Sequence, residues 1–200
     1  MQFGDSEFYT FIIKYITKNN MKDILYDQYR ITGKLSSHIS IYLLLTNRGF
    51  RRIYYFRKIQ NSKGLKQYFF NMLCHILLRR VSIEIPNSVR IGKGILINHP
   101  YGITFNSKSI IGDNFTILKG ATIGNSKTGK VGTPVIGNNV YVGLNSTVVG
   151  GITIGNNVLI AANTFVNFDV PDNSIVIGSP GVIHHKENAS MPYITNMVKE

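Results

Sequence analysis

The chain has little of several features that mark common protein classes. It has one cysteine, Cys74, among its 200 residues, so it cannot form an internal disulfide. No apolar run approaches the roughly 18 residues that a membrane-spanning helix requires. The first residues lack both the basic and the apolar part of a signal peptide. We therefore expect a cytoplasmic protein in which Cys74 is a small buried residue of an apolar helix.

Acidic residues are also scarce, and most of the imbalance lies in the first part of the chain. The sequence has 22 lysines and arginines against 10 aspartates and glutamates. Residues 1–80 hold 14 of the basic and 4 of the acidic residues, a net charge of +10, whereas residues 81–200 carry only +2. This asymmetry predicts a separate basic region at residues 1–80.

The basic region has the pattern of helices with apolar faces. The first expected helix carries one apolar stripe, made of Phe8, Phe11, Ile12, Tyr15 and Ile16. A second, strongly apolar helix is expected from Leu65 to Leu78.

Between these two helices, the segment from Arg48 to Lys58 interleaves basic and aromatic residues. Such a segment predicts peripheral contact with an anionic membrane, because basic side chains and aromatic rings both favour that interface. The alternative is that its aromatic residues pack a helical core. No nucleic-acid-binding motif accompanies the charge, so we expect no nucleic acid partner.

The rest of the chain, from Ser82 to about His185, repeats every six residues. A small residue usually follows each apolar β-branched residue, and Asn or Asp often comes next, as a tight corner requires. The period predicts a parallel β-helix, because strands of an antiparallel sandwich, the alternative, are longer and less evenly spaced. The beat runs through Ile91, Ile97 and Ile103, then after a two-residue slip through Ile111, Ile117 and Ile123, and later through Ile136, Val142, Val148, Ile154, Ile160 and Val166.

Two further features of the repeat can be read from the sequence. The segment 124–134, rich in Gly, Ser and Lys, interrupts the beat and predicts a loop that leaves the solenoid. A second packing position is expected two residues before each inward one, at Val89, Ile95, Phe115, Ala121, Val140, Ile152 and Val158.

Three segments carry a resemblance to a known family. They are Ile97 to Ile103, which contains a His-x-x-Gly-Ile motif, the Gly/Lys loop after Ile123, and the closing run Val170 to Pro180. Residues 84–183 resemble the hexapeptide-repeat acyltransferases, in the branch of serine acetyltransferases and O-acetyltransferases of bacterial surface polysaccharides. The resemblance implies a mainly β fold, a left-handed parallel β-helix at residues 81–185. A small N-terminal α-helical region precedes it at 1–80 and a tail follows at 186–200.

The resemblance also implies catalytic residues and a partner copy. His99 takes the place of the general base and Glu84 that of a helper carboxylate. A histidine suits this role because its pKa lies near neutral pH, and a carboxylate can orient it. The family is usually a homotrimer with active sites between neighbouring solenoids. We also expect a trimer because a flank rich in Ile and Val would need a cover.

Acetyl-CoA is the implied cosubstrate. Lys119, Lys127, Lys130 and Lys186 are candidates for contact with its phosphates, although simple solvation is the alternative for each. His184 and His185 lack a third ligand at useful spacing, so no metal is expected. The residues implied to bind the cosubstrate are Gly143, Leu144, Ala161, Ala162, Pro180 and Gly124.

The acceptor is less defined, and Asn98, Tyr101 and Thr133 are its expected contacts. Serine acetyltransferases carry an aspartate where this chain has Asn98, and a histidine where it has Thr133. These departures favour a neutral acceptor, a sugar hydroxyl of surface polysaccharide or of its nucleotide- or lipid-linked precursor. Serine O-acetylation is the alternative activity, and a trimeric β-helix that only binds ligands is the non-enzymatic alternative.

Overall fold

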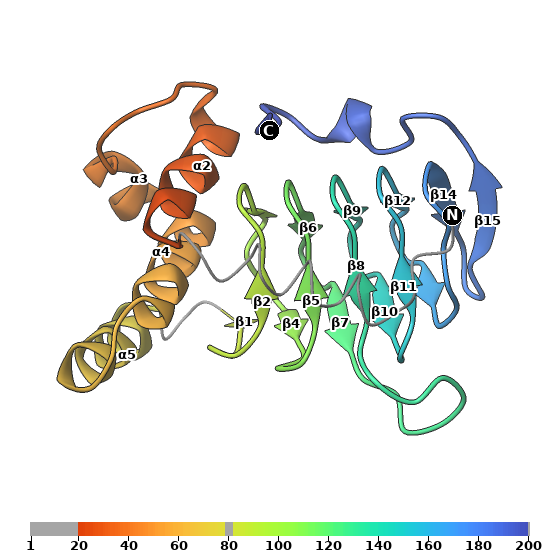
Figure 1. The fold of residues 1–200 in the computed structure, drawn as a ribbon, viewed down its shortest axis with the longest axis horizontal. Helices are drawn as coiled ribbons and strands as arrows, with labels where there is room; N and C mark the ends of the chain where they lie inside the picture. The colour runs from red at the N-terminus through yellow and green to blue at the C-terminus, as the bar shows by residue number, and fades with distance from the viewer. Residues whose placement is uncertain (1–19, 79–81, 200) are drawn as a thin grey trace, which may run out of the picture.

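The computed structural model describes residues 20–78 and 82–199, and these form a group of helices at one end of a parallel solenoid (Figure 1). The helix expected over Phe8 to Ile16 lies outside the described residues. Ser40 and Asn47 cap the N-termini of two of the helices, because their side chains accept hydrogen bonds from the backbone N–H of Leu43 and Phe50. The helices are α2 (Asn20–Thr32), α3 (Ile41–Thr46), α4 (Arg48–Gln60) and α5 (Leu65–Leu77). The second expected helix is thus present as α5.

The solenoid is built from three sheets, and the expected parallel β-helix is confirmed. The first sheet has the order β1 (Ile83–Glu84), β4 (Ile103–Phe105), β7 (Thr122–Gly124), β10 (Thr147–Val149) and β13 (Phe165–Val166). The second has the order β11 (Thr153–Ile154), β8 (Val135–Ile136), β5 (Ile110–Ile111) and β2 (Arg90–Ile91). The third has the order β15 (Val182–His185), β14 (Ser174–Ile177), β12 (Leu159–Ile160), β9 (Tyr141–Val142), β6 (Thr116–Leu118) and β3 (Leu96–Asn98). All pairs are parallel except β14 with β15.

The inward residues of the six-residue repeat form the core of the solenoid, a prism whose three faces are the three sheets. The inward residues expected from the beat are all at most 4% exposed, and those expected at the second packing position are at most 2% exposed. The expectation of an Ile/Val-rich flank that needs a cover is therefore wrong. These side chains fill the interior of a single chain, and the core continues into α4 through Ile53 and Phe56.

Corners of the solenoid are held by stacked asparagines. Asn114, Asn139 and Asn157 each adopt a φ of 56°, a conformation that Asn tolerates better than other non-glycine residues. The Nδ2 of Asn114 donates to Oδ1 of Asn139 at 3.0 Å, and that of Asn139 to Oδ1 of Asn157 at 3.1 Å. Beside this ladder, Gly92 has no room for a side chain, since a Cβ there would lie 2.1 Å from Oδ1 of Asp113. The glycines and asparagines of the repeat thus allow the coils to stack closely as well as allowing the chain to turn at the corners.

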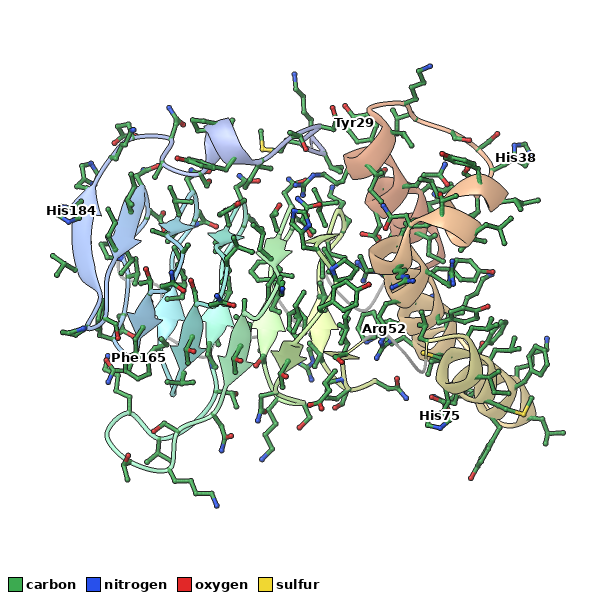
Figure 2. All side chains as sticks on the ribbon, turned by 180° about the vertical axis from the view of Figure 1, so that it is seen from behind. Tyr29, His38, Arg52, His75, Phe165 and His184 are labelled. Atoms are coloured by element: carbon green, nitrogen blue, oxygen red, sulfur yellow. The ribbon has the colours of Figure 1, made fainter. Side chains whose placement is uncertain are left out.

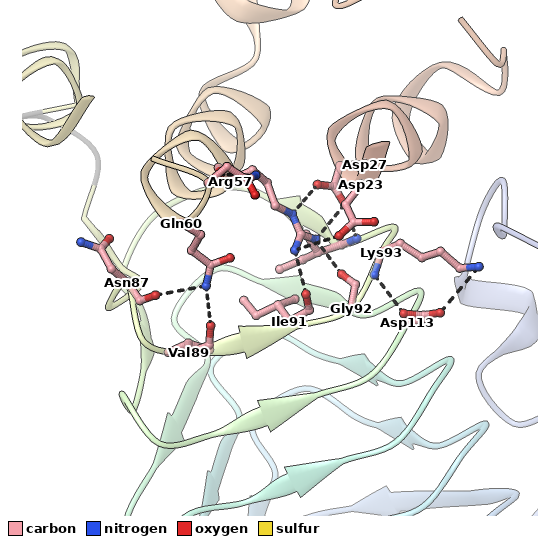
Figure 3. A network of polar contacts seen from close by, with 12 residues as sticks. Asp23, Asp27, Arg57, Gln60, Asn87, Val89, Ile91, Gly92, Lys93 and Asp113 are labelled. Atoms are coloured by element: carbon pink, nitrogen blue, oxygen red, sulfur yellow. Dashed lines mark hydrogen bonds and ion pairs between the residues drawn. The ribbon is translucent and has the colours of Figure 1, made fainter. Parts of the chain in front are cut away.

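A buried arginine, Arg57, joins the helices to the first coil (Figure 3). Arg57 of α4 is fully buried, and its Nε donates to Oδ2 of Asp27 of α2 at 3.0 Å. Its Nη1 and Nη2 donate to the carbonyl oxygens of Ile91 at 2.7 Å and Gly92 at 2.6 Å. The guanidinium therefore satisfies backbone groups at the open end of the solenoid, where no preceding coil pairs with them.

Much of the segment from Arg48 to Lys58 belongs to this junction. Phe50, Phe56 and Arg52 are buried, as is Arg57. Packing of a helical core, the alternative left open from the sequence, is thus the structural role of these two aromatic residues. Among the described residues, no helix is both long and apolar enough to cross a membrane.

The chain after β15 runs back along the solenoid to α2 (Figure 1). Arg30 of α2 holds it there, since its Nε donates to the carbonyl of Thr195 at 2.8 Å. The Nη2 of the same arginine donates to the hydroxyl of Thr116 of β6 at 2.8 Å and so links α2 to the solenoid. Val198 completes the asparagine ladder, because its N–H donates to Oδ1 of Asn114 at 2.8 Å. We call residues 186–199, which include the 3-10 helix η1 (Met191–Tyr193), the C-terminal strap.

Cys74 differs in part from its prediction. It lies on α5 as expected, but it is only half-buried. Burial raises the pKa of its thiol, which disfavours the reactive thiolate.

Candidate active site

His99 occupies a corner of the solenoid that is two residues longer than the equivalent corner of the next coil, since Ile97 pairs with Ile117 and Phe105 with Ile123. The corner, residues 99–102, joins β3 to β4, and the two-residue slip of the sequence falls here. Ile103 is in register with Ile83 of the coil before, while Phe105 is in register with Ile123 of the coil after. Both side chains point into the core, so β4 absorbs the slip and leaves a longer turn around His99.

The backbone of His99 is itself unusual. Its φ is 53°, in the left-handed region, and every other described non-glycine residue with positive φ is an asparagine. A histidine in this conformation costs conformational energy, which is a common property of functional positions. The side chain is exposed, so the imidazole is accessible to a substrate.

Two of the expected acceptor contacts lie at the same corner. Asn98 is the exposed last residue of β3, and Tyr101 is 39% exposed. The N–H of Tyr101 donates to the carbonyl of His99 at 2.8 Å, which closes the turn. The structure therefore brings Asn98, His99 and Tyr101 together.

Glu84 lies on β1, on the strand that pairs with the one after the corner. It is exposed and in register with Thr104, and the N–H of Ile103 donates to the carbonyl of Ser82 at 3.1 Å. Among the described residues, no ion pair or hydrogen bond joins the carboxylate of Glu84 to the imidazole of His99. The helper role of Glu84 thus stays a prediction.

The expected cosubstrate residues lie on the same edge of the prism as His99, with one exception. The edge is continuous, because Asn145 N–H donates to the carbonyl of Lys119 at 2.9 Å and Asn163 N–H to that of Leu144 at 2.7 Å. Gly178 N–H then donates to the hydroxyl of Thr164 at 3.2 Å. We call this the His99 edge, formed by residues 99–102, 119–121, 143–146, 161–164 and 178–181.

Most of the expected cosubstrate contacts on this edge have small side chains. Gly143, Leu144, Ala161, Ala162 and Pro180 occupy its last three segments. Coils stack at about 4.8 Å, so four steps from His99 reach the Pro180 segment at about 19 Å. A long, thin molecule with its reactive end at His99 could therefore lie along the edge.

Gly124 and Thr133 belong to a different edge. The loop 124–134 leaves the solenoid between β7 and β8, and Ser126 pairs with Gly132 across it. Thr133 donates its hydroxyl to the carbonyl of Lys108 at 3.3 Å. Within one chain these two residues are therefore separate from His99.

The four candidate lysines are spread over the solenoid. Lys119 lies on the His99 edge, Lys127 in the loop, and Lys186 just after β15, and all three are exposed. Lys130 forms an ion pair with Asp169. This pair also lowers the pKa of the Asp169 carboxyl.

Sequence patterns did not point to Arg48, which the structure places at the His99 corner. Its Nη1 donates to the phenol oxygen of Tyr101, and its guanidinium carbon lies 6.0 Å from the ring centre of Tyr101. Arg48 is the first residue of α4, about fifty positions before the corner, and no periodicity links the two segments.

Metal ligands do not gather in the described part of the chain. Figure 2 shows His38 and His75 among the helices and His184 at the opposite end of the solenoid. Within residues 20–78 and 82–199, no group of three or more His, Cys, Asp or Glu side chains is arranged to hold a metal ion.

Part of the solenoid is similar to one family model and to several known acetyltransferases. Residues 133–167 match the family model described as bacterial transferase hexapeptide (six repeats). A serine acetyltransferase of Synechococcus elongatus is 37% identical over 118 residues, which cover 58% of this chain and 48% of that protein. Escherichia coli WcaB, assigned to colanic acid biosynthesis as an acetyltransferase, is 42% identical over 95 residues, 48% of this chain and 59% of WcaB. The chain thus spans about half the length of the curated relatives it matches.

A solved structure gives a longer match. The crystal structure of Neisseria gonorrhoeae serine acetyltransferase in complex with serine has a TM-score of 0.67 and 27% sequence identity. The match covers 89% of this chain and 73% of that one, so it includes helices as well as coils. The solenoid is thus a left-handed hexapeptide-repeat β-helix like that of the acetyltransferases.

Proposed function

We propose that this protein, whose solenoid carries the bacterial transferase hexapeptide repeat, is an acetyl-CoA-dependent O-acetyltransferase with His99 as its general base. The observation that carries the proposal is the His99 edge. An exposed histidine with a strained backbone stands at one end of a row of small residues that can take an extended thioester.

The reaction follows from the chemistry of these groups. His99 accepts the proton of an acceptor hydroxyl while the hydroxyl oxygen attacks the thioester carbonyl. The C–S bond then breaks, the coenzyme A thiolate leaves, and the imidazolium can return the proton to it. Glu84 would stabilise the imidazolium if it reaches His99 in the assembled protein.

A homotrimer is part of this proposal. In one chain, the loop edge with Gly124 and Thr133 is separate from the His99 edge. A threefold arrangement of prisms could set the loop edge of one copy against the His99 edge of the next. The active site would then contain residues of two copies.

The trimer predicts a definite mass in solution. We expect sedimentation equilibrium at micromolar concentration to give about three times the 22.4 kDa chain mass. Deletion of residues 126–131 should reduce transfer, because each active site then loses the loop that the neighbouring copy supplies. A stable monomer with full activity would contradict the shared site.

The acceptor that the comparisons support best is serine, rather than the sugar hydroxyl favoured by the sequence. Serine acetyltransferases are found both among the sequence relatives and among the matching structures. The sugar acceptor is the second candidate. The match to WcaB favours it, as does the presence of Asn98 and Thr133 where serine acetyltransferases carry ionisable residues.

A direct assay separates the two acceptors. The full-length protein is incubated with labelled acetyl-CoA and, in parallel, with serine and with a panel of free and nucleotide-linked sugars. We expect label in O-acetylserine at a higher rate than in any sugar. Transfer to sugars alone would establish the second candidate, and no transfer to any hydroxyl would contradict the transferase proposal.

A further inference from the structure

The first turn of α4 is fixed against the catalytic corner by close packing. Gly49 lies against β3, where an added Cβ would be 2.5 Å from the carbonyl oxygen of Ile97. Asn47 caps the helix through its contact with the N–H of Phe50 at 2.8 Å. The backbone at Arg48, next to Gly49, is therefore held against the strand that leads into His99, since Ile97 precedes His99 by two residues.

Arg48 differs from the other arginines of α4 in what its guanidinium contacts. Arg52 and Arg57 are buried and donate to backbone carbonyls, and Arg57 also pairs with Asp27. Arg51 donates to the carbonyls of Leu44 and Leu45. Arg48 is exposed and contacts only the phenol of Tyr101 among the described residues.

The guanidinium of Arg48 thus has donors left to offer beside His99. It carries five N–H donors, of which the phenol takes one. No described carboxylate pairs with it, so its charge is not neutralised. Tyr101 holds the group by a hydrogen bond and by its ring face. The result is an oriented cation at the corner where the acceptor hydroxyl must be deprotonated.

We infer that Arg48 binds a carboxylate of the acceptor and that Tyr101 positions it. The inference rests on the proposed transferase function, with serine as the acceptor, and deepens it by naming the residue that recognises the carboxylate next to the reacting hydroxyl. A guanidinium pairs with a carboxylate in a planar, two-pronged contact, which an ammonium cannot reproduce.

The neighbouring cations are less suited to this task. Lys119, in the next segment of the His99 edge, is a flexible point charge. Lys130 of the loop is already paired with Asp169. The arginine belongs to α4, which Arg57 anchors to the first coil.

The test compares two acceptors that differ only at one group, which is a carboxylate in serine and a neutral amide in serinamide. Serine and serinamide share the hydroxyl and the amino group, but serinamide has no carboxylate. For Arg48→Gln we expect the KM for serine to rise about 10- to 100-fold, the loss of a hydrogen bond to a charged group. The KM for serinamide and that for acetyl-CoA should change less than about twofold. Arg48→Lys should recover part of the loss, and Tyr101→Phe should raise the KM for serine by a smaller factor.

Lys66→Gln is the matched control, because it removes a positive charge from exposed α5 away from the corner. It should leave all three KM values unchanged. An equal rise in KM for serine and serinamide in Arg48→Gln, or no rise, would overturn the inference.

Serine binding is also measured by calorimetry on the unmodified protein and on Arg48→Gln, so that the outcome does not depend on turnover. Weaker binding in the variant supports the inference even if acetyl transfer is absent, in which case only the transferase proposal fails. A protein that acetylates sugars and neither binds nor acetylates serine would overturn the inference and leave the transferase proposal standing.

Discussion

His99→Asn is expected to reduce kcat by about 100- to 10,000-fold, the usual cost of losing a general base. Asparagine is the informative replacement here. Every other described non-glycine residue with positive φ is an asparagine, so this side chain suits the backbone at position 99. Loss of activity in this variant can then be assigned to the imidazole rather than to a distorted corner.

His99→Ala tests the same position with added strain. Alanine has no such tolerance for positive φ, so this variant should lose activity and some stability as well. Asn173→Ala, at a different corner with a φ of 54°, measures the cost of this strain and should keep full activity. More than a tenth of wild-type kcat in His99→Asn, measured at saturating acetyl-CoA, would remove His99 from the mechanism.

Arg57→Met is expected to lower the free energy of unfolding by about 3–5 kcal/mol. The change leaves the carboxylate of Asp27 buried without its partner, and it also removes the donors from the carbonyls of Ile91 and Gly92. Asp27 would keep only backbone donors, the N–H of Ile95 at 2.9 Å and the N–H of Gly94. Urea unfolding followed by circular dichroism measures the loss.

A second variant makes this prediction independent of how Arg57→Met folds. Asp27→Asn keeps the shape of the side chain but leaves buried Arg57 with only the more distant carboxylate of Asp23, at 3.9 Å, so it should be destabilised in the same direction. Lys66→Gln, on the exposed face of α5, should change the free energy of unfolding by no more than about 0.5 kcal/mol. A loss below 1 kcal/mol in both junction variants would show that the helices do not depend on this pair.

The solenoid could be predicted from the sequence because its contacts are periodic. Each inward residue from Ile136 to Val166 meets its equivalent one coil away, so a single beat of six encodes core, strands and corners together. The slip before Ile111 also carried information, since it marks the longer corner at His99. Its meaning became clear only when the register of β4 was known.

The contacts of the helical region could not be predicted in this way. Arg57 meets Asp27 thirty residues earlier and Ile91 thirty-four residues later, and neither separation repeats. From sequence, Arg48 and Arg57 look alike within one basic and aromatic segment. In the structure, Arg48 is an exposed neighbour of the His99 corner, whereas Arg57 is a buried support. Only the packing of α4 on the first coil separates the two roles.

The C-terminal strap changes how the solenoid can unfold. Arrays of repeats usually contact only their neighbours, so their ends can fray one unit at a time. Here Arg30 holds Thr195, 165 positions away, and Asn114 holds Val198 across 84 positions. The last residues of the chain thus close a loop onto its first coils. An opening at either end must release the other, so the strap turns a linear stack into a single cooperative unit.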